Sequence, residues 1–322
     1  MEPIDFDIIP AWLSQLFALL TAPLRAPFEP GTLFHWPFLL STLIIGFAVF
    51  AATTGKGPLS FWRRYFNAGV WWHPSARADY RYYLVNGALF PLMFTPFFAV
   101  SSLVAGGVRD LIGTSVEVGT IGWVATLIYS IGFFVAFDFG RYIGHWVQHK
   151  SSFLWEFHKI HHSAEVLTPF TSFRVHPVDL LFMSLTPGLC TGVVTGFAAV
   201  FWGADIGFYT VLSMHAGVAA YHAISNLRHT QIWVSYGPVL SRILISPAQH
   251  QIHHSAEPKH FHKNMGWALA IWDRLFGTLY VPAKDENIVY GLGDGSDGEY
   301  HGVARMYMLP FAKIWQNLRT KS

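Results

Sequence analysis

Residues 138–177 read DFGRYIGHWVQHKSSFLWEFHKIHHSAEVLTPFTSFRVHP, and the histidines in this stretch recur at helical spacing. Residues 145–149 form an HxxxH pattern, and residues 158–162 form an HxxHH pattern. Side chains three and four residues apart share one face of a helix. Each pattern therefore predicts a helix that directs two or three imidazoles toward one point.

A second HxxHH pattern occupies residues 250–254. Neutral imidazole is a strong ligand for iron, zinc, copper and nickel. Together with His222, the three patterns supply as metal-ligand candidates His145, His149, His158, His161, His162, His222, His250, His253 and His254. A structural zinc takes four protein ligands and a catalytic zinc about three. The set is therefore too large for one ion and suits two.

Other polar residues could support these ligands or add to them. Ligating histidines usually pass their second ring N–H to a carboxylate or carbonyl. The candidates are Asp138, His176, Asn226, His229 and Asp273. His222, Asn226 and His229 all remain open as the group that completes the metal shell, and His222 is favoured.

Charged residues near the first HxxHH pattern have more than one interpretation each. Glu156 and Glu165 flank the pattern and are either partners of the ligands or ordinary solvated carboxylates. Arg174 and Arg242 offset local negative charge, contact a lipid headgroup or are exposed cations. No catalytic residue beyond the metal centre stands out.

The composition indicates a multispanning membrane protein. The 322 residues are 52% hydrophobic and only 12% charged, against about 25% charged in a typical soluble domain, and the mean hydropathy is +0.34. A net charge of +2 gives no sign of a nucleic-acid partner. Cys190 is the single cysteine, which excludes a disulfide framework and any cysteine-based zinc or iron–sulfur site. No nucleotide-cofactor motif is convincing.

Apolar stretches near the ~20 residues that a bilayer needs predict an all-α fold, a transmembrane bundle of about 4–5 spans with a cytoplasmic, histidine-rich helical cap. The expected spans are Trp36–Thr54, Tyr82–Val108, Gly119–Phe137, Leu180–Gly203 and Ile206–Ala223. We expect three regions: an N-terminal transmembrane region over 1–130, a catalytic domain over 131–282, and a loop with an amphipathic helix over 283–322.

Loop charge predicts the orientation. Residues 55–82 hold five lysines and arginines, so the positive-inside rule places them in the cytoplasm. Five spans then bring every histidine pattern to the cytoplasmic side. A helix over 119–149 would run roughly 45 Å at ~1.5 Å per residue, beyond the ~30 Å hydrocarbon layer. The sequence therefore predicts a multi-pass protein of a bacterial inner membrane or the endoplasmic reticulum.

The order HxxxH, HxxHH, HxxHH, with spans between, resembles the fatty acid hydroxylase / sterol desaturase superfamily of integral-membrane oxidases. The stretch ISPAQHQIHHSAEP, followed by KNMGWALAIWDRLFGTLYVP, looks like its bacterial branch. The resemblance covers about Gly132–Pro282. It implies two iron ions, with O2 as co-substrate, that hydroxylate or desaturate a C–H bond of a fatty acyl, sterol or ether lipid. It also implies an external electron donor of the cytochrome b5, ferredoxin or flavin-reductase kind. The ligands carried over are the eight histidines of the three patterns.

Two other functions remain open from the residues. A membrane metal transporter would want polar residues deep inside several spans, and the predicted spans carry few. A bis-histidine haem protein would show a strong visible absorption band.

Overall fold

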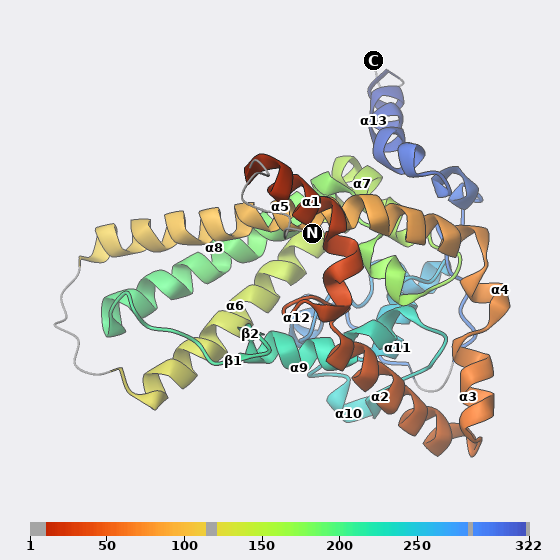
Figure 1. Ribbon diagram of the computed structural model, residues 1–322, viewed down its shortest axis with the longest axis horizontal. Helices are drawn as coiled ribbons and strands as arrows, with labels where there is room; N and C mark the ends of the chain where they lie inside the picture. The colour runs from red at the N-terminus through yellow and green to blue at the C-terminus, as the bar shows by residue number, and fades with distance from the viewer. Residues whose placement is uncertain (1–10, 114–120, 283–285, 320–322) are drawn as a thin grey trace, which may run out of the picture.

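The structure is a computed structural model that describes residues 11–113, 121–282 and 286–319 (Figure 1). Four helices are long: α2 (Trp36–Thr54), α5 (Pro74–Ile112), α6 (Trp123–Lys150) and α8 (Pro177–Trp202). The shorter elements are α1 (Ala11–Arg25), η2 (Ala26–Phe28), α3 (Pro58–Tyr65), α4 (Ala68–Trp71), α7 (Ser152–His162), η3 (Pro169–Phe173), β1 (Thr210–Val211), β2 (Met214–His215), α9 (Ala216–Ser225), η4 (Asn226–His229), α10 (Gly237–Leu240), α11 (Pro247–His253), η5 (Pro258–His260), α12 (Ile271–Leu275), η6 (Asp297–Tyr300) and α13 (Val303–Arg319).

The long helices confirm the predicted membrane-protein fold. Helices α2, α6 and α8 are each long and apolar enough to cross a membrane. Helix α5 makes a fourth span if its two parts, Pro74–Leu89 and Phe94–Ile112, count as one segment with a 42° bend. The start expected for the third span, Gly119, lies outside the described residues. Helix α6 runs without a break from Trp123 through the HxxxH pattern. It therefore continues past the predicted span, as expected of a helix longer than the hydrocarbon layer.

Small residues let the bundle helices approach closely. Helix α8 lies between α5 and α6, as Figure 1 shows. A Cβ added at Gly140 of α6 would lie 2.6 Å from the backbone nitrogen of Pro187 in α8. A Cβ at Gly192 of α8 would lie 2.7 Å from the Ser101 carbonyl oxygen in α5. Helix packing in membranes commonly uses such small residues, because lipid provides no hydrophobic drive for association.

The expected fifth span over Ile206–Ala223 does not form. The segment folds as the β1–β2 hairpin, with φ of 50° at Leu212 and 61° at Ser213 in its turn, followed by the ten-residue helix α9. Ten residues at ~1.5 Å each are too short for a bilayer. Helix α9 packs along α2 and α6, whereas Tyr209, Val211 and Leu212 of the hairpin are exposed. The apolar residues of the two parts together resemble a span in the sequence.

This segment nevertheless returns the chain to the histidines. The Tyr209 amide donates to Ser130 Oγ of α6 at 2.9 Å, and His215 Nε2 lies 2.9 Å from the Ser130 carbonyl oxygen. Four residues after Ser130 on α6, the ring of Phe134 packs against Gly217. The chain therefore follows α6 toward its histidine-bearing end and enters η4 there.

Candidate metal centre

Four elements bring the histidines of the sequence patterns together. Helices α6 and α7 carry the HxxxH pattern and the first HxxHH pattern. Helix α11 carries the second HxxHH pattern, with His254 at its C-cap. A capping box between Ser246 and Gln249, with Pro247 at the first helical position, fixes the start of α11. The fourth element, η4, ends at His229.

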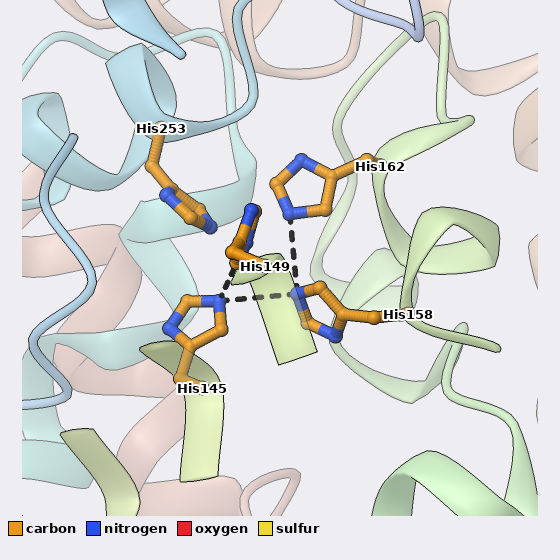
Figure 2. Close-up of side chains that lie close together, drawn as sticks. All are labelled: His145, His149, His158, His162 and His253. Atoms are coloured by element: carbon orange, nitrogen blue, oxygen red, sulfur yellow. Dashed lines mark hydrogen bonds between the residues drawn. The ribbon is translucent and has the colours of Figure 1, made fainter. Parts of the chain in front are cut away.

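The first histidine group consists of His145, His149, His158, His162 and His253 (Figure 2). One ring nitrogen of each lies within 4.8 Å of the others. Nε2 of His145 lies 3.1 Å from Nε2 of His158 and 3.2 Å from Nε2 of His149. Nε2 of His162 lies 3.2 Å from Nε2 of His158. The five rings thus enclose one small space from three helices.

The hydrogen bonds of this group leave lone pairs facing one another. Nδ1 of His145 lies 2.7 Å from the Met265 carbonyl oxygen, and Nδ1 of His253 lies 2.8 Å from another backbone carbonyl. Nδ1 of His158 lies 3.0 Å from the carboxylate of Asp179. Each of these oxygens accepts, so the three Nδ1 atoms carry the protons and the three Nε2 atoms are bare. Bare nitrogens 3.1 Å apart repel unless a cation lies among them. The residues therefore fit a metal ion.

The second histidine group consists of His161, His229, His250 and His254. Nε2 of His229 lies 3.0 Å from Nε2 of His250 and 3.2 Å from Nε2 of His254. Adjacent histidines of each HxxHH pattern go to different groups: His161 and His162 separate, as do His253 and His254. Neighbouring positions on a helix diverge by ~100°, so each pattern serves both groups.

Burial keeps the rings in the form that binds metal. All nine rings have between 1% and 9% of their surface exposed. Burial lowers the pKa of His161 to about 3. Burial, followed by repulsion from neighbouring imidazoles, holds the pKa of His162 and of His254 well below the usual range. These rings are neutral at pH 7, and neutral imidazole is the ligating form.

The two groups differ in the charge beside them. The first group has the Asp179 carboxylate against His158. The second has Nη2 of Arg228 at 2.6 Å from Nδ1 of His250. A guanidinium only donates, so this Nδ1 is bare and the proton of the neutral ring lies on Nε2, the atom that faces the group. A metal ion at the second group must displace that proton and lie near a cation.

Of the three residues left open by the sequence, only His229 joins a group. The favoured His222 lies outside both, with its ring against Phe38 at 5.5 Å between centroids. The amide of Asn226 donates to a backbone carbonyl near α2 at 3.1 Å. His176 caps α8, where its Nδ1 accepts from a backbone N–H at 3.0 Å. His222 faces α2, while the 3₁₀ turn that follows α9 directs His229 toward α7 and α11.

Asp138 and Asp273 bind the loop over residues 261–270, which leads into α12, rather than the rings of the first group. Asp138 accepts hydrogen bonds from backbone amides of this loop and from the Trp272 indole at 2.8 Å. Asp273 accepts from the Met265 amide at 2.7 Å. The carbonyl of the same Met265 meets His145, so Asp273 fixes that ring through one intervening residue.

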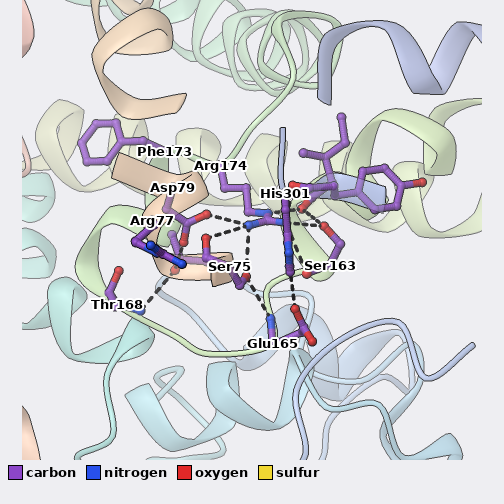
Figure 3. Close-up of polar contacts among 12 residues, drawn as sticks. Ser75, Arg77, Asp79, Ser163, Glu165, Thr168, Phe173, Arg174 and His301 are labelled. Carbon is purple, nitrogen blue, oxygen red and sulfur yellow. Dashed lines mark hydrogen bonds and ion pairs between the residues drawn. The ribbon is translucent and has the colours of Figure 1, made fainter. Parts of the chain in front are cut away.

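Arg174 is fully buried and supports the end of α7 (Figure 3). It donates to the Ile160 carbonyl oxygen at 2.8 Å and to Ser163 Oγ at 2.8 Å, and it pairs with Asp79 of α5 at 2.7 Å. It also donates to the Tyr300 carbonyl oxygen at 3.1 Å. The residue therefore offsets the negative charge of Asp79 and is neither an exposed cation nor a headgroup contact. Arg242, in contrast, is exposed.

The two glutamates near α7 also find partners away from the rings. Glu156 pairs with Lys159 at 2.7 Å, and Glu165 pairs with His301 at 2.6 Å. Figure 3 shows the second pair beside the buried arginine.

The part of the chain that carries these histidines is similar to known proteins. Residues 130–278 match the family model described as fatty acid hydroxylase. Alkylglycerol monooxygenase of Danio rerio is 32% identical over 166 residues, which cover 49% of this chain and 32% of that protein. Ornithine lipid hydroxylase OlsE of Rhizobium tropici is 29% identical over 170 residues, covering 53% and 47%. Delta(7)-sterol 5(6)-desaturase of Eremothecium gossypii is 29% identical over 166 residues, covering 52% and 41%.

The matched segments span less than half of each of these relatives, at 32%, 47% and 41% of their lengths. No solved structure matches the chain.

Proposed function

Residues 130–278 form a fatty acid hydroxylase domain, which confirms the resemblance seen in the histidine patterns, and from this premise we propose a membrane-bound di-iron oxidoreductase. It would use O2 to hydroxylate or desaturate a C–H bond of a lipid, with electrons from a separate donor. The observation that carries the proposal is the convergence of nine buried histidines into one group of five and one of four. The comparisons give the transporter alternative no support.

The proposed ligands follow the two groups. His145, His149, His158, His162 and His253 would hold one iron ion, and His161, His229, His250 and His254 would hold the other. Two irons with an all-imidazole shell would supply the oxidising power that protein side chains lack for an unactivated C–H bond. Imidazoles are neutral, unlike the carboxylates of soluble di-iron bundles, so the bound ions would keep a high positive charge.

The protein's own contribution is to hold the rings, fix their protons and exclude water. Carbonyl and carboxylate oxygens keep the protons of His145, His158 and His253 on Nδ1, so that Nε2 is free to ligate. The burial of all nine rings keeps bulk water from the site. The long α6 connects the apolar bundle to the histidines, so a lipid substrate would approach from the bilayer.

The relatives suggest the substrate class. Their names refer to alkylglycerol, ornithine lipid and sterol, so we propose a lipid with a long apolar portion. We further propose that the histidines lie on the cytoplasmic side, since the basic residues between α2 and α5 favour that orientation. Labelling of single cysteines in a Cys190→Ser background would test the orientation.

Two measurements test the function. Protein purified in detergent and loaded with ferrous iron without oxygen should contain about two irons per chain. Cells that express the protein under ¹⁸O2 should accumulate a hydroxylated lipid with the label, or an unsaturated lipid without it, and the His161→Ala variant should accumulate neither. A well-folded protein that takes up no stoichiometric metal would refute the proposal.

A further inference from the structure

Trp155 lies between the first histidine group and the surface. It belongs to α7, and its ring centroid is 5.0 Å from that of His149, 5.3 Å from that of His162 and 6.1 Å from that of His158. The three histidines are buried, whereas Trp155 is partly exposed. One indole thus contacts three rings of the group on one side and reaches the outside on the other.

The proposed chemistry needs a route for electrons. O2-dependent oxidation of a C–H bond requires reduced metal, and the sequence carries no convincing nucleotide-cofactor motif. Electron transfer slows steeply with the distance between donor and acceptor, so a partner that stops at the surface needs a short path through the protein. An indole packed on three ligand rings is such a path, because its π system continues from the surface to the metal shell.

We propose that Trp155 is the residue through which an acidic one-electron carrier protein reduces the metal ion of the first histidine group. The inference rests on the proposed di-iron function. In each step one electron leaves the carrier, which becomes oxidised, and one ferric ion becomes ferrous. No bond is formed or broken, and two carriers reduce the pair of ions.

Basic and apolar residues lie near His149, one of the rings that Trp155 contacts. Lys150 is exposed and directly follows His149. His262 is exposed, with its ring 5.9 Å from that of His149. Lys263 follows it, and the preceding Phe261 is 47% exposed. We call Lys150, Trp155, Phe261, His262 and Lys263 the Trp155 surface.

The nearest glutamates in the sequence do not cancel this charge. Glu156 pairs with Lys159 at 2.7 Å, and Glu257 pairs with Lys259 at 3.1 Å. Lys150 and Lys263 form no ion pair among the described residues, although Nζ of Lys263 donates to the Gly277 carbonyl oxygen at 3.5 Å. Their positive charge fits a partner whose docking face is negative, since opposite potentials steer association and orient the partners. An anionic lipid surface would meet the same charges, and the experiment separates the two.

The test uses the full chain in detergent, loaded with iron and oxidised to the ferric state before oxygen is removed. Reduced plant-type ferredoxin, an acidic [2Fe–2S] carrier, is the probe. Stopped-flow absorbance follows the oxidation of the ferredoxin. The Trp155→Leu variant should slow this oxidation at least tenfold with its iron content unchanged, and Trp155→Phe should restore most of the rate. The matched control is Phe153→Leu, because Phe153 is 53% exposed on the same helix and packs on Phe157 instead of a histidine. Reduced methyl viologen, a small reductant, should reduce every variant equally.

Each outcome of these measurements supports or overturns the role of Trp155. Wild-type rates in an iron-replete Trp155→Leu variant would overturn the proposal. If that variant loses iron, the double variant Lys150→Glu/Lys263→Glu decides, since it leaves the indole in place. It should lower the second-order rate constant at least tenfold at low salt and weaken its dependence on ionic strength. An unchanged rate constant would overturn the proposal. It would indicate that the two lysines face an anionic lipid surface instead of a carrier protein. Wild-type protein without iron would refute the di-iron function itself.

Discussion

Nδ1 of His158 lies 3.0 Å from Oδ2 of Asp179, and both side chains are buried. The other carboxylate oxygen accepts from the Gln148 amide at 2.6 Å, so the carboxylate is fixed between α6 and the first histidine group. A carboxylate behind a ligating imidazole sets its tautomer and raises its basicity. Asp179 is thus a positioning residue, although it lies in the first turn of another long helix.

Replacing Asp179 by Asn should weaken metal binding at the first group. The amide carries no charge, and one of its two ends must face a donor from His158 or Gln148. We expect about a 10- to 100-fold loss of affinity for one ion, measured by competition with a chromophoric chelator. The exposed Asp205 supplies the control Asp205→Asn, which should bind both ions normally. Equal affinities in the two variants would contradict the role of Asp179.

Metal should leave the two groups at different rates. The first group offers five histidines with a carboxylate beside them, and the second offers four with Arg228 against His250. The guanidinium repels a dication and favours the tautomer whose proton blocks Nε2. A chelator should therefore remove one ion well before the other, in two phases of equal size. Arg228→Gln should slow the fast phase. A single phase with both ions lost together would argue against this asymmetry.

The sequence could predict those histidines of the two groups that recur at helical spacing. HxxxH and HxxHH spacings specify which rings share a face, and eight of the nine grouped histidines belong to these patterns. It could not predict Asp179 or Arg228, because their contacts join residues 21 and 22 positions apart through tertiary packing. Asp179 after Pro177 resembles an ordinary carboxylate at a helix start. The prediction of a fifth span failed for a related reason, since an apolar hairpin followed by a short helix packed on α2 and α6 has the same composition as a span.

His229 and His222 should respond differently to removal. His229 has Nε2 within 3.2 Å of two other histidines of the second group, whereas the ring of His222 packs on Phe38. We expect His229→Ala to bind about one iron fewer per chain and His222→Ala to bind the full amount. Metal analysis of the purified variants, with circular dichroism to check helix content, makes the comparison. The opposite result would place the ligand on α9 instead of η4.

Arg174 should be needed for the stability of α7. Its guanidinium is completely buried and joins Ile160 and Ser163 to Asp79. Removing one partner of a buried ion pair leaves an uncompensated charge and costs about 3–5 kcal/mol. Arg174→Met should therefore lower the free energy of unfolding by about that amount and reduce metal retention. The control is Arg242→Met at an exposed arginine, which should change neither quantity. Similar melting curves for the two variants would show that the buried network is dispensable.

The contact between Gly140 and Pro187 should control the spacing of α6 and α8. A Cβ at Gly140 would lie 2.6 Å from the Pro187 nitrogen, a backbone atom that cannot rotate away. Overpacking of this kind typically costs 1–3 kcal/mol. Separation of the helices would also stretch the Gln148–Asp179 contact, which holds the carboxylate behind the first histidine group.

Gly140→Ala should therefore lower both the melting temperature in detergent and the affinity for one metal ion. Gly107 of α5 is the matched control, since a Cβ there meets nothing within 4 Å. Gly107→Ala should leave metal binding unchanged and keep or slightly raise stability, because alanine favours the helix by up to ~1 kcal/mol. If Gly140→Ala melts like Gly107→Ala and retains both ions, the spacing of α6 and α8 does not govern the metal centre.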